Sequence, residues 1–303
     1  MLPFAQALRA HPAYFAAAAL QAAVDLRLPD QLQQPGSLAG LAAQNGWDLR
    51  RLTALAVILE ELGCLHRLPD QQWHWRACAA PPQPQVRQHW GRLAEVIASG
   101  QPLDSSEHTS AYQLSMAAAH AQPASEWASR WLPLLPAQGL VLDVGAGLGT
   151  WSRAVVDARQ KWRALQVDSQ PLDSLAQAHP RIQRLTADAT ALPRLPPVDF
   201  AVSAHLLHHL GDAAAQLCLQ QMAQALRPGG WLSVVEVFEL AGQPKPNVAH
   251  WFDLDMALYS PQGRVRPLAE VVDLLVAAGC AEVNWRILDA EVGVVEVWAK
   301  GVG

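Results

Sequence analysis

The segment that decides the fold is residues 141–149, Val141-Leu-Asp-Val-Gly-Ala-Gly-Leu-Gly149. Its first half is an apolar run, as in strands buried on both faces, and its second half carries glycine at every other position. Glycine lets the backbone turn tightly and approach a bound molecule closely. We therefore predict a buried strand, a ligand-binding loop and a helix that begins near Trp151.

Apolar runs separated by helical stretches continue from this segment to residue 299. The runs cover residues 140–144, 164–167, 181–186, 200–203, 231–237, 283–288 and 292–299. Strands that alternate with helices form a parallel sheet covered on both faces. Only residues 289–291 separate the last two runs, so we expect the sheet to end in an antiparallel hairpin. The predicted fold class is α/β, with a Rossmann-like sheet.

The N-terminal part of the chain has a different pattern. Residues 15–32 and 49–62 have helical periodicity, and a short helix with Ser37 as its N-cap covers residues 37–43. Gly63 closes the third helix, and two short strands then flank a turn at Pro69-Asp70. Three helices followed by a β-hairpin are typical of a mostly helical winged-helix domain.

Winged helices often bind DNA, but the charge of this one favours another role. Residues 1–90 hold seven arginines against six acidic residues, far from the basic surface that phosphate binding rewards. The candidate recognition helix carries Arg50 and Arg51 but also Glu60 and Glu61. The alanine-rich first helix suits burial against a partner subunit. We therefore expect a homodimer through this domain and no nucleic-acid partner.

The middle of the chain joins the two patterns. Pro81-Pro-Gln-Pro84 indicates a linker, and residues 90–99, 111–121 and 124–135 indicate connecting helices that roof a cleft. The predicted domains are residues 1–80 for the dimerisation domain, 81–135 for the helical bridge and 136–303 for the ligand-binding domain.

Composition limits the classes of protein that the chain can belong to. A hydrophobic content of 51% and a net charge of −5 over 303 residues exclude a disordered chain and disfavour a nucleic-acid binder. The four cysteines, Cys64, Cys78, Cys218 and Cys280, have no metal-ligand spacing, and we expect them to be reduced. We find no signal peptide and no long apolar segment, so we expect a soluble cytoplasmic protein away from membranes.

Three aspartates indicate which ligand the glycine loop binds. A dinucleotide fingerprint requires G-x-G-x-x-G, but position 150 is threonine, and Asp143 is poorly placed beside a pyrophosphate. A carboxylate at this position suits the cationic methionyl end of S-adenosylmethionine. Asp168 ends the second strand, where it is placed to bind ribose hydroxyls, and Asp188 ends the third, where it is placed to bind the adenine amino group. The predicted cofactor-binding residues are Asp143, Gly145, Gly147, Gly149, Asp168, Asp188, Ala189, Ser203 and His205.

These motifs resemble those of the S-adenosylmethionine-dependent O-methyltransferases of secondary metabolism. In that family a winged-helix dimerisation domain precedes a class I methyltransferase domain. The glycine loop, Asp168, Asp188 and Leu226-Arg-Pro-Gly-Gly230 match class I methyltransferases in general, and the Asp253-x-x-Met256 element narrows the resemblance to this family. The resemblance implies the strand order 3-2-1-4-5-7-6 and a homodimer.

The resemblance also implies the catalytic residues. The family's general base lies in a His-Asp-Trp-x-Asp segment that here is His208-His-Leu-Gly-Asp212, and the glutamate that orients the base falls at Glu236. Imidazole titrates near neutral pH and suits the deprotonation of a phenol or enol. The other reading of His208 is a structural or substrate-orienting histidine. The sequence departs from the family at His209-Leu210, and Val265 stands where a second glutamate is usual.

We therefore expect methylation of a hydroxyl on a small, aromatic or polyketide-like metabolite, without a metal ion. Met116, Asp253 and Met256 are the residues that we expect to face this acceptor. Methylation of nitrogen, carbon or sulfur on the same scaffold is the alternative, because such acceptors need positioning more than a base. A homologue that binds the cofactor but has altered or lost methyl transfer is a further alternative.

Overall fold

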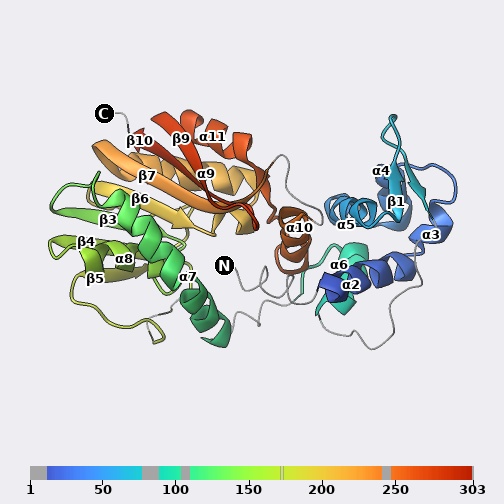
Figure 1. Cartoon of the computed structure of the whole chain (residues 1–303), viewed down its shortest axis with the longest axis horizontal. Helices are drawn as coiled ribbons and strands as arrows, with labels where there is room; N and C mark the ends of the chain where they lie inside the picture. Colours follow the sequence, from blue (N-terminus) through green and yellow to red (C-terminus); the bar gives the residue numbers. More distant parts are fainter. Residues whose placement is uncertain are drawn as a thin grey trace. The chain divides into compact units, whose positions relative to one another are not determined.

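A computed structural model describes residues 12–76, 89–103, 110–170, 172, 174–240 and 247–301 (Figure 1). The chain divides into two compact units, and each has buried apolar residues of its own. The sheet unit consists of Ser106–Ala241 and Arg266–Gly303 with the first three residues, and the helical unit consists of Phe4–Ser105 and Gly242–Val265.

The sheet unit contains the predicted sheet. Its strands in chain order are β3 (Gly139–Val144), β4 (Trp162–Asp168), β5 (Ile182–Thr186), β6 (Val198–Ala204), β7 (Leu226–Glu239), β9 (Cys280–Asp289) and β10 (Val294–Gly301). They lie side by side in the order β5-β4-β3-β6-β7-β10-β9, which confirms the predicted order 3-2-1-4-5-7-6. The first five are parallel, whereas β10 is antiparallel to both neighbours and forms the expected hairpin with β9. A short strand, β8 (Arg266–Pro267), pairs with β7.

Helices cover both faces of this sheet, because alternate side chains of each strand enter two different cores. Val141 of β3 packs with α7 (Ser110–Trp131) and α8 (Thr150–Ala158). Its neighbour Leu142 packs with α9 (Asp212–Ala225) and α11 (Leu268–Ala277). Burial on both faces explains why the strands are continuous apolar runs in the sequence.

Helix α7 corrects one prediction. The sequence suggested two helices that break at Gln122-Pro123, but a single helix continues through Pro123. A proline inside a helix costs roughly 3 kcal/mol or more. Two buried tryptophans on the following turns, Trp127 and Trp131, offset that cost by donating hydrogen bonds to Oε1 of Glu296 at 2.7 and 2.5 Å.

The helical unit follows the predicted order of helices and hairpin. It contains α2 (Pro12–Asp25), α3 (Leu28–Gln31), α4 (Leu38–Asn45), α5 (Leu49–Glu61), the hairpin β1 (Leu65–Arg67) and β2 (Trp73–Trp75), η1 (His89–Arg92), α6 (Leu93–Ser99) and α10 (Val248–Tyr259). Ser37 caps α4 as expected, and its hydroxyl accepts a hydrogen bond from the Gly40 amide. Asp48 caps α5 in the same way. None of the described helices is long and apolar enough to cross a bilayer.

The unit boundaries differ from the predicted domains. Helix α10 was assigned to the domain of residues 136–303, but its Trp251, Leu254 and Leu258 are buried in the core of the helical unit. The predicted bridge of residues 81–135 is also divided, since α6 belongs to the helical unit and α7 to the sheet unit. Apolar packing between segments distant in the chain sets these boundaries, and local periodicity does not reveal it.

Candidate active site

The glycine loop joins β3 to α8, and its backbone requires glycine. Gly145, Gly147 and Gly149 have φ angles of 70°, 54° and 81°, which other residues rarely adopt. A Cβ atom on Gly149 would lie 2.0 Å from Nε2 of Gln166, and one on Gly145 would lie 2.8 Å from Leu206. A Cβ atom on Gly147 would have Gln113 Oε1 as its nearest neighbour, at 3.5 Å. The outer glycines therefore permit close packing within the protein, whereas a Cβ atom on Gly147 would make only an ordinary contact.

Two charged side chains hold the Gly147 peptide from opposite sides. Asp168, at the end of β4, accepts a hydrogen bond from the Gly147 amide at 2.8 Å. Arg184 of β5 donates to the Gly147 carbonyl and to Gln166 Oε1, each at 2.5 Å. A carboxylate has about four acceptor positions, so Asp168 retains capacity for a ribose hydroxyl. Sequence reasoning identified Asp168 but missed Arg184, because a lone arginine in a strand usually indicates an exposed face.

Asp143 lies inside the protein and bonds to the first turn of α8. Its Oδ2 accepts hydrogen bonds from the amide and the hydroxyl of Ser152, at 3.1 and 2.7 Å. Burial raises its pKa to about 6, although the bonds from Ser152 oppose that shift. The structure thus gives Asp143 a helix-capping partner, and its predicted interaction with a cationic ligand stays a prediction.

The end of β5 carries two further residues predicted to bind the cofactor. Asp188 is exposed, and its Oδ1 accepts from the amide and the hydroxyl of Thr190, both at 2.7 Å. These bonds hold the pKa of Asp188 below its usual value. Ala189 is half-buried against the core on the α9 side. Asp188 is placed at the predicted strand end, and its contact with adenine stays a prediction.

A cluster of aromatic rings lies beyond the end of β6. His120 of α7 stacks on His205, with ring centroids 4.5 Å apart and an interplanar angle of 17°. Trp151 of α8 lies beside both rings, at 6.0 Å from His120 and 6.1 Å from His205. His205 has a φ angle of 56°, and its amide donates to the Val235 carbonyl. The sequence predicted His205 at this position but gave no indication of His120 or Trp151.

Several polar atoms at this edge of the sheet are buried and lack a hydrogen-bond partner among the described residues. They are His120 Nε2, Trp151 Nε1, His205 Nδ1 and the hydroxyl of Ser203. Burial, followed by the neighbouring His205, lowers the pKa of His120 to about 2, so that ring is neutral. Buried polar atoms are normally satisfied, and a bound polar molecule would satisfy these. This observation fits a cofactor with a polar end at this position.

His208 and Glu236 form a buried pair next to this cluster. His208 lies on the single turn η3 (Leu207–His209), and its Nδ1 is 2.6 Å from Oε1 of Glu236 on β7. Burial alone would raise the pKa of Glu236, but the charge and the hydrogen bond of His208, with His205 nearby, hold it well below its ordinary value. The contact between His208 and Glu236 that the resemblance implied is therefore present. Nε2 of His208 lies 3.1 Å from Nε2 of His209.

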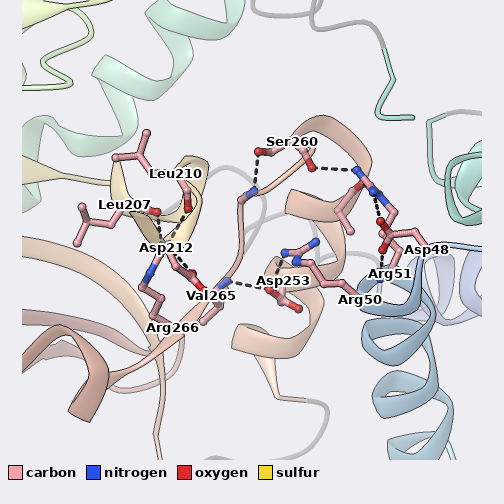
Figure 2. A network of polar contacts seen from close by, with 12 residues as sticks. Asp48, Arg50, Arg51, Leu207, Leu210, Asp212, Asp253, Ser260, Val265 and Arg266 are labelled. Carbon is pink, nitrogen blue, oxygen red and sulfur yellow. Dashed lines mark hydrogen bonds and ion pairs between the residues drawn. The ribbon is translucent and has the colours of Figure 1, made fainter. Parts of the chain in front are cut away.

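Buried Arg266 positions this turn. Its guanidinium donates to the carbonyls of Leu207 and Leu210 and forms an ion pair with Asp212, as Figure 2 shows. A charged donor that binds carbonyls on both sides of His208 fixes the backbone from which the imidazole extends. Nothing in the local sequence pattern identified Arg266.

One group of described residues has the composition of a metal site. Ligand atoms of His205, His208 and Glu236 all lie within 4.8 Å of one another. The 2.6 Å distance between His208 Nδ1 and Glu236 Oε1 is that of a direct hydrogen bond. Two ligands of one zinc ion with bonds of ~2 Å would lie farther apart. We therefore assign the group to hydrogen bonding.

The residues predicted to face the acceptor fall in both units. Met116 is half-buried on α7 in the sheet unit. Met256 and Asp253 lie on α10 in the helical unit, where Met256 is buried. Asp253 accepts from Arg50 at 3.2 Å and from the Val265 amide at 2.8 Å (Figure 2). Asp253 thus has protein partners of its own, and the contact of these three residues with an acceptor stays a prediction.

Comparison with known proteins adds independent information. Residues 141–230 match a family model described as a methyltransferase domain. Over 158 residues the chain is 30% identical to acetylserotonin O-methyltransferase of Mus musculus, a match that covers 48% of this chain and 40% of the mouse protein. The chain therefore matches less than half of the length of this relative.

Solved structures share the fold over almost the whole chain. An O-methyltransferase family 2 protein from Planctomyces limnophilus, in complex with apigenin, aligns with this chain with a TM-score of 0.66 at 19% identity. The alignment covers 95% of this chain and 93% of that protein. Human N-acetylserotonin methyltransferase in complex with SAM has a TM-score of 0.58 at 18% identity, with coverage of 98% and 96%.

Proposed function

We propose that this chain, which carries a methyltransferase domain in its residues 141–230, transfers the methyl group of S-adenosylmethionine to a hydroxyl of a small aromatic or polyketide-like metabolite. The observation that carries this proposal is the buried pair of His208 and Glu236 beside the glycine loop. Leu206, two residues before His208, packs against Gly145. A general base and a cofactor loop thus lie in contact through neighbouring residues.

The arrangement of the loop supports S-adenosylmethionine as the cofactor. When bound, the cofactor supplies an electrophilic methyl group on a sulfonium. Asp168 would accept hydrogen bonds from the ribose, and the backbone of Gly147, which has no side chain, would let the ligand approach closely. The unpartnered atoms of His120 and Trp151 would satisfy the polar methionyl end.

The chemistry of the pair supports a hydroxyl acceptor. A neutral phenol or enol is a poor nucleophile until its proton is removed, and an imidazole is suited to that removal near neutral pH. The ionised Glu236 accepts from Nδ1 of His208, which leaves the lone pair of the ring on Nε2. Glu236 then stabilises the imidazolium that forms. Transfer to the deprotonated oxygen needs mainly alignment of the two reactants.

We also propose that the chain forms a homodimer and that it is cytoplasmic. The resemblance of the N-terminal helices and hairpin to dimerisation domains supports a homodimer through the helical unit, which light scattering on the full chain would test. Two cysteines, Cys218 and Cys280, are buried free thiols. Free thiols are typical of the reducing cytoplasm, and this supports a cytoplasmic location.

Calorimetry tests the cofactor and mass spectrometry tests the reaction. We expect S-adenosylhomocysteine to bind the full chain, and Asp168→Asn to weaken that binding at least tenfold. Asp157→Asn is the matched control, because this side chain of α8 is half-exposed and pairs with Arg153. A panel of phenols, amines and thiols with labelled cofactor should give O-methyl products. Absence of binding would overturn the cofactor assignment, and methylation confined to amines, thiols or carbon would overturn only the hydroxyl acceptor.

A further inference from the structure

The basic nitrogen of His208 already has a partner in the protein. Nε2 of His208 lies 3.1 Å from Nε2 of His209, and the two ring centroids are 4.2 Å apart. His208 is buried, with 4% of its surface exposed, whereas His209 is half-buried. Of the two adjacent imidazoles, His209 is therefore the one with more access to the outside of the core.

The direction of this hydrogen bond follows from Glu236. The carboxylate is ionised, so it accepts a proton from Nδ1 of His208 at 2.6 Å. In the neutral form that can act as a base, the His208 imidazole carries this one proton, which leaves its Nε2 as an acceptor. The atom opposite must then be the donor, and that atom is Nε2 of His209. The lone pair that would deprotonate an acceptor is thus engaged by an N–H group of His209.

We propose that His209 is a catalytic residue that takes the proton of the acceptor hydroxyl and passes a proton to the pair of His208 and Glu236. The inference rests on the proposed function. The O–H bond of the acceptor breaks as a bond forms between its proton and Nδ1 of His209. At the same time the proton on Nε2 of His209 moves to Nε2 of His208. The electron pair stays on the acceptor oxygen, and the positive charge rests on His208 against Glu236. The proton later leaves for solvent by the reverse path.

The surrounding charges make His208 the better place for the positive charge. Glu236 contacts His208 directly, and its Oε1 is 3.8 Å from Nδ1 of His205. Burial lowers the pKa of His205, and that of His120 behind it, so neither ring adds a competing positive charge. The guanidinium of Arg266 is bound to the carbonyls of this turn and to Asp212. Transfer of a proton from His209 to His208 thus places the positive charge beside the carboxylate of Glu236.

Replacement of His209 by glutamine distinguishes proton transfer through His209 from hydrogen bonding to His208. In His209→Gln the amide can still donate to Nε2 of His208, but it cannot pass a proton. We expect kcat for an un-ionised phenol to fall about 10²-fold or more, the usual size of a general-base contribution. KM for that phenol and the affinity for S-adenosylhomocysteine should change less than about threefold, and His209→Ala should behave in the same way. His74→Gln, at a half-buried histidine of the hairpin in the helical unit, is the control.

An acidic acceptor provides the decisive comparison. A nitrophenol that is ionised at the assay pH has no proton to remove, so His209→Gln should methylate it within about threefold of the wild type. Full turnover of the un-ionised phenol by His209→Gln, with loss in His208→Ala, would overturn this inference and leave the proposed function intact. An equal loss with both phenols would assign His209 a structural role and also overturn it. Absence of any O-methyl product from the wild type would instead overturn the proposed function.

Discussion

Glu236 Oε1 lies 2.6 Å from Nδ1 of His208, although 28 positions separate the two residues in the chain. The bond crosses from β7 to the turn after β6, and both side chains are buried. A buried carboxylate that accepts from one ring nitrogen fixes the tautomer of the imidazole and balances its charge after protonation.

Loss of the charge on this carboxylate should slow methyl transfer. Glu236→Gln keeps the shape of the side chain but cannot stabilise an imidazolium, so kcat/KM for a phenol should fall roughly 10²–10⁴-fold. Binding of S-adenosylhomocysteine, measured by calorimetry, should stay within about threefold. Glu239→Gln, at the exposed end of the same strand, serves as the control. Wild-type turnover by Glu236→Gln would show that the pair is structural.

Gly149→Ala should weaken cofactor binding for a steric reason. The new Cβ would lie 2.0 Å from Gln166 Nε2, and Gln166 cannot move aside because it is bonded to Gly149, Ser152 and Arg184. Gly229→Ala is a matched control, since Gly229 also has a positive φ, of 75°, but has no atom within 4 Å of its Cβ position. Both variants incur the backbone strain of about 1–2 kcal/mol. Only Gly149→Ala should lower cofactor affinity, by at least tenfold in calorimetry, and equal affinities would contradict the clash.

Glu296 should be a major determinant of the stability of the sheet unit. It is fully buried, binds Trp127, Trp131 and Ser233 through one oxygen, and pairs with Arg286 through the other. Removal of one partner of a buried ion pair costs roughly 3–5 kcal/mol. Glu296→Ala should therefore lower the free energy of unfolding by about that amount in urea titrations.

Glu282→Ala is the comparison for that experiment. This residue is 60% exposed and lies 3.7 Å from Lys300, so its loss should change the free energy of unfolding by less than about 1 kcal/mol. Equal effects in the two variants would mean that the tryptophan contacts to Glu296 contribute little.

The buried carboxyl of Asp143 predicts a dependence of stability on pH. Its pKa is raised from 3.8 in the unfolded chain to about 6 in the folded chain. Between these two pH values the folded chain therefore keeps a proton that the unfolded chain has released. Stability contributed by this group is present below pH 4 and is lost as the pH rises to about 6. The difference amounts to at most about 3 kcal/mol. Urea titrations of the cofactor-free chain should show Asp143→Asn gaining stability relative to the wild type over this range. Parallel pH profiles for the two proteins would contradict the shift.

Much of the sheet unit could be predicted from sequence, because short local patterns of residues encode its strands and the loop that follows β3. Strands buried on both faces are continuous apolar runs, and three successive strands each place an aspartate at or close to one edge, at Asp143, Asp168 and Asp188. The spacing between His208 and Glu236, taken with the resemblance, predicted a contact that is present.

What sequence could not reveal depends on packing between distant segments. His120 has no motif, and it meets His205 only because α7 lies against the sheet. Arg184 and Arg266 resemble ordinary charged residues until their partners are seen to be backbone carbonyls. The continuity of α7 through Pro123 depends on tryptophans that bind a glutamate 165 or more positions later.

The two bonds to the Gly147 peptide have a thermodynamic consequence. Asp168 and Arg184 fix both ends of that peptide by contacts inside the protein, so the entropy of ordering the loop is lost during folding and not during association. Cofactor binding should therefore be rapid and accompanied by little rearrangement of the loop. Substitution of Arg184, a residue that need not touch the cofactor, should weaken its binding by making the free loop more disordered.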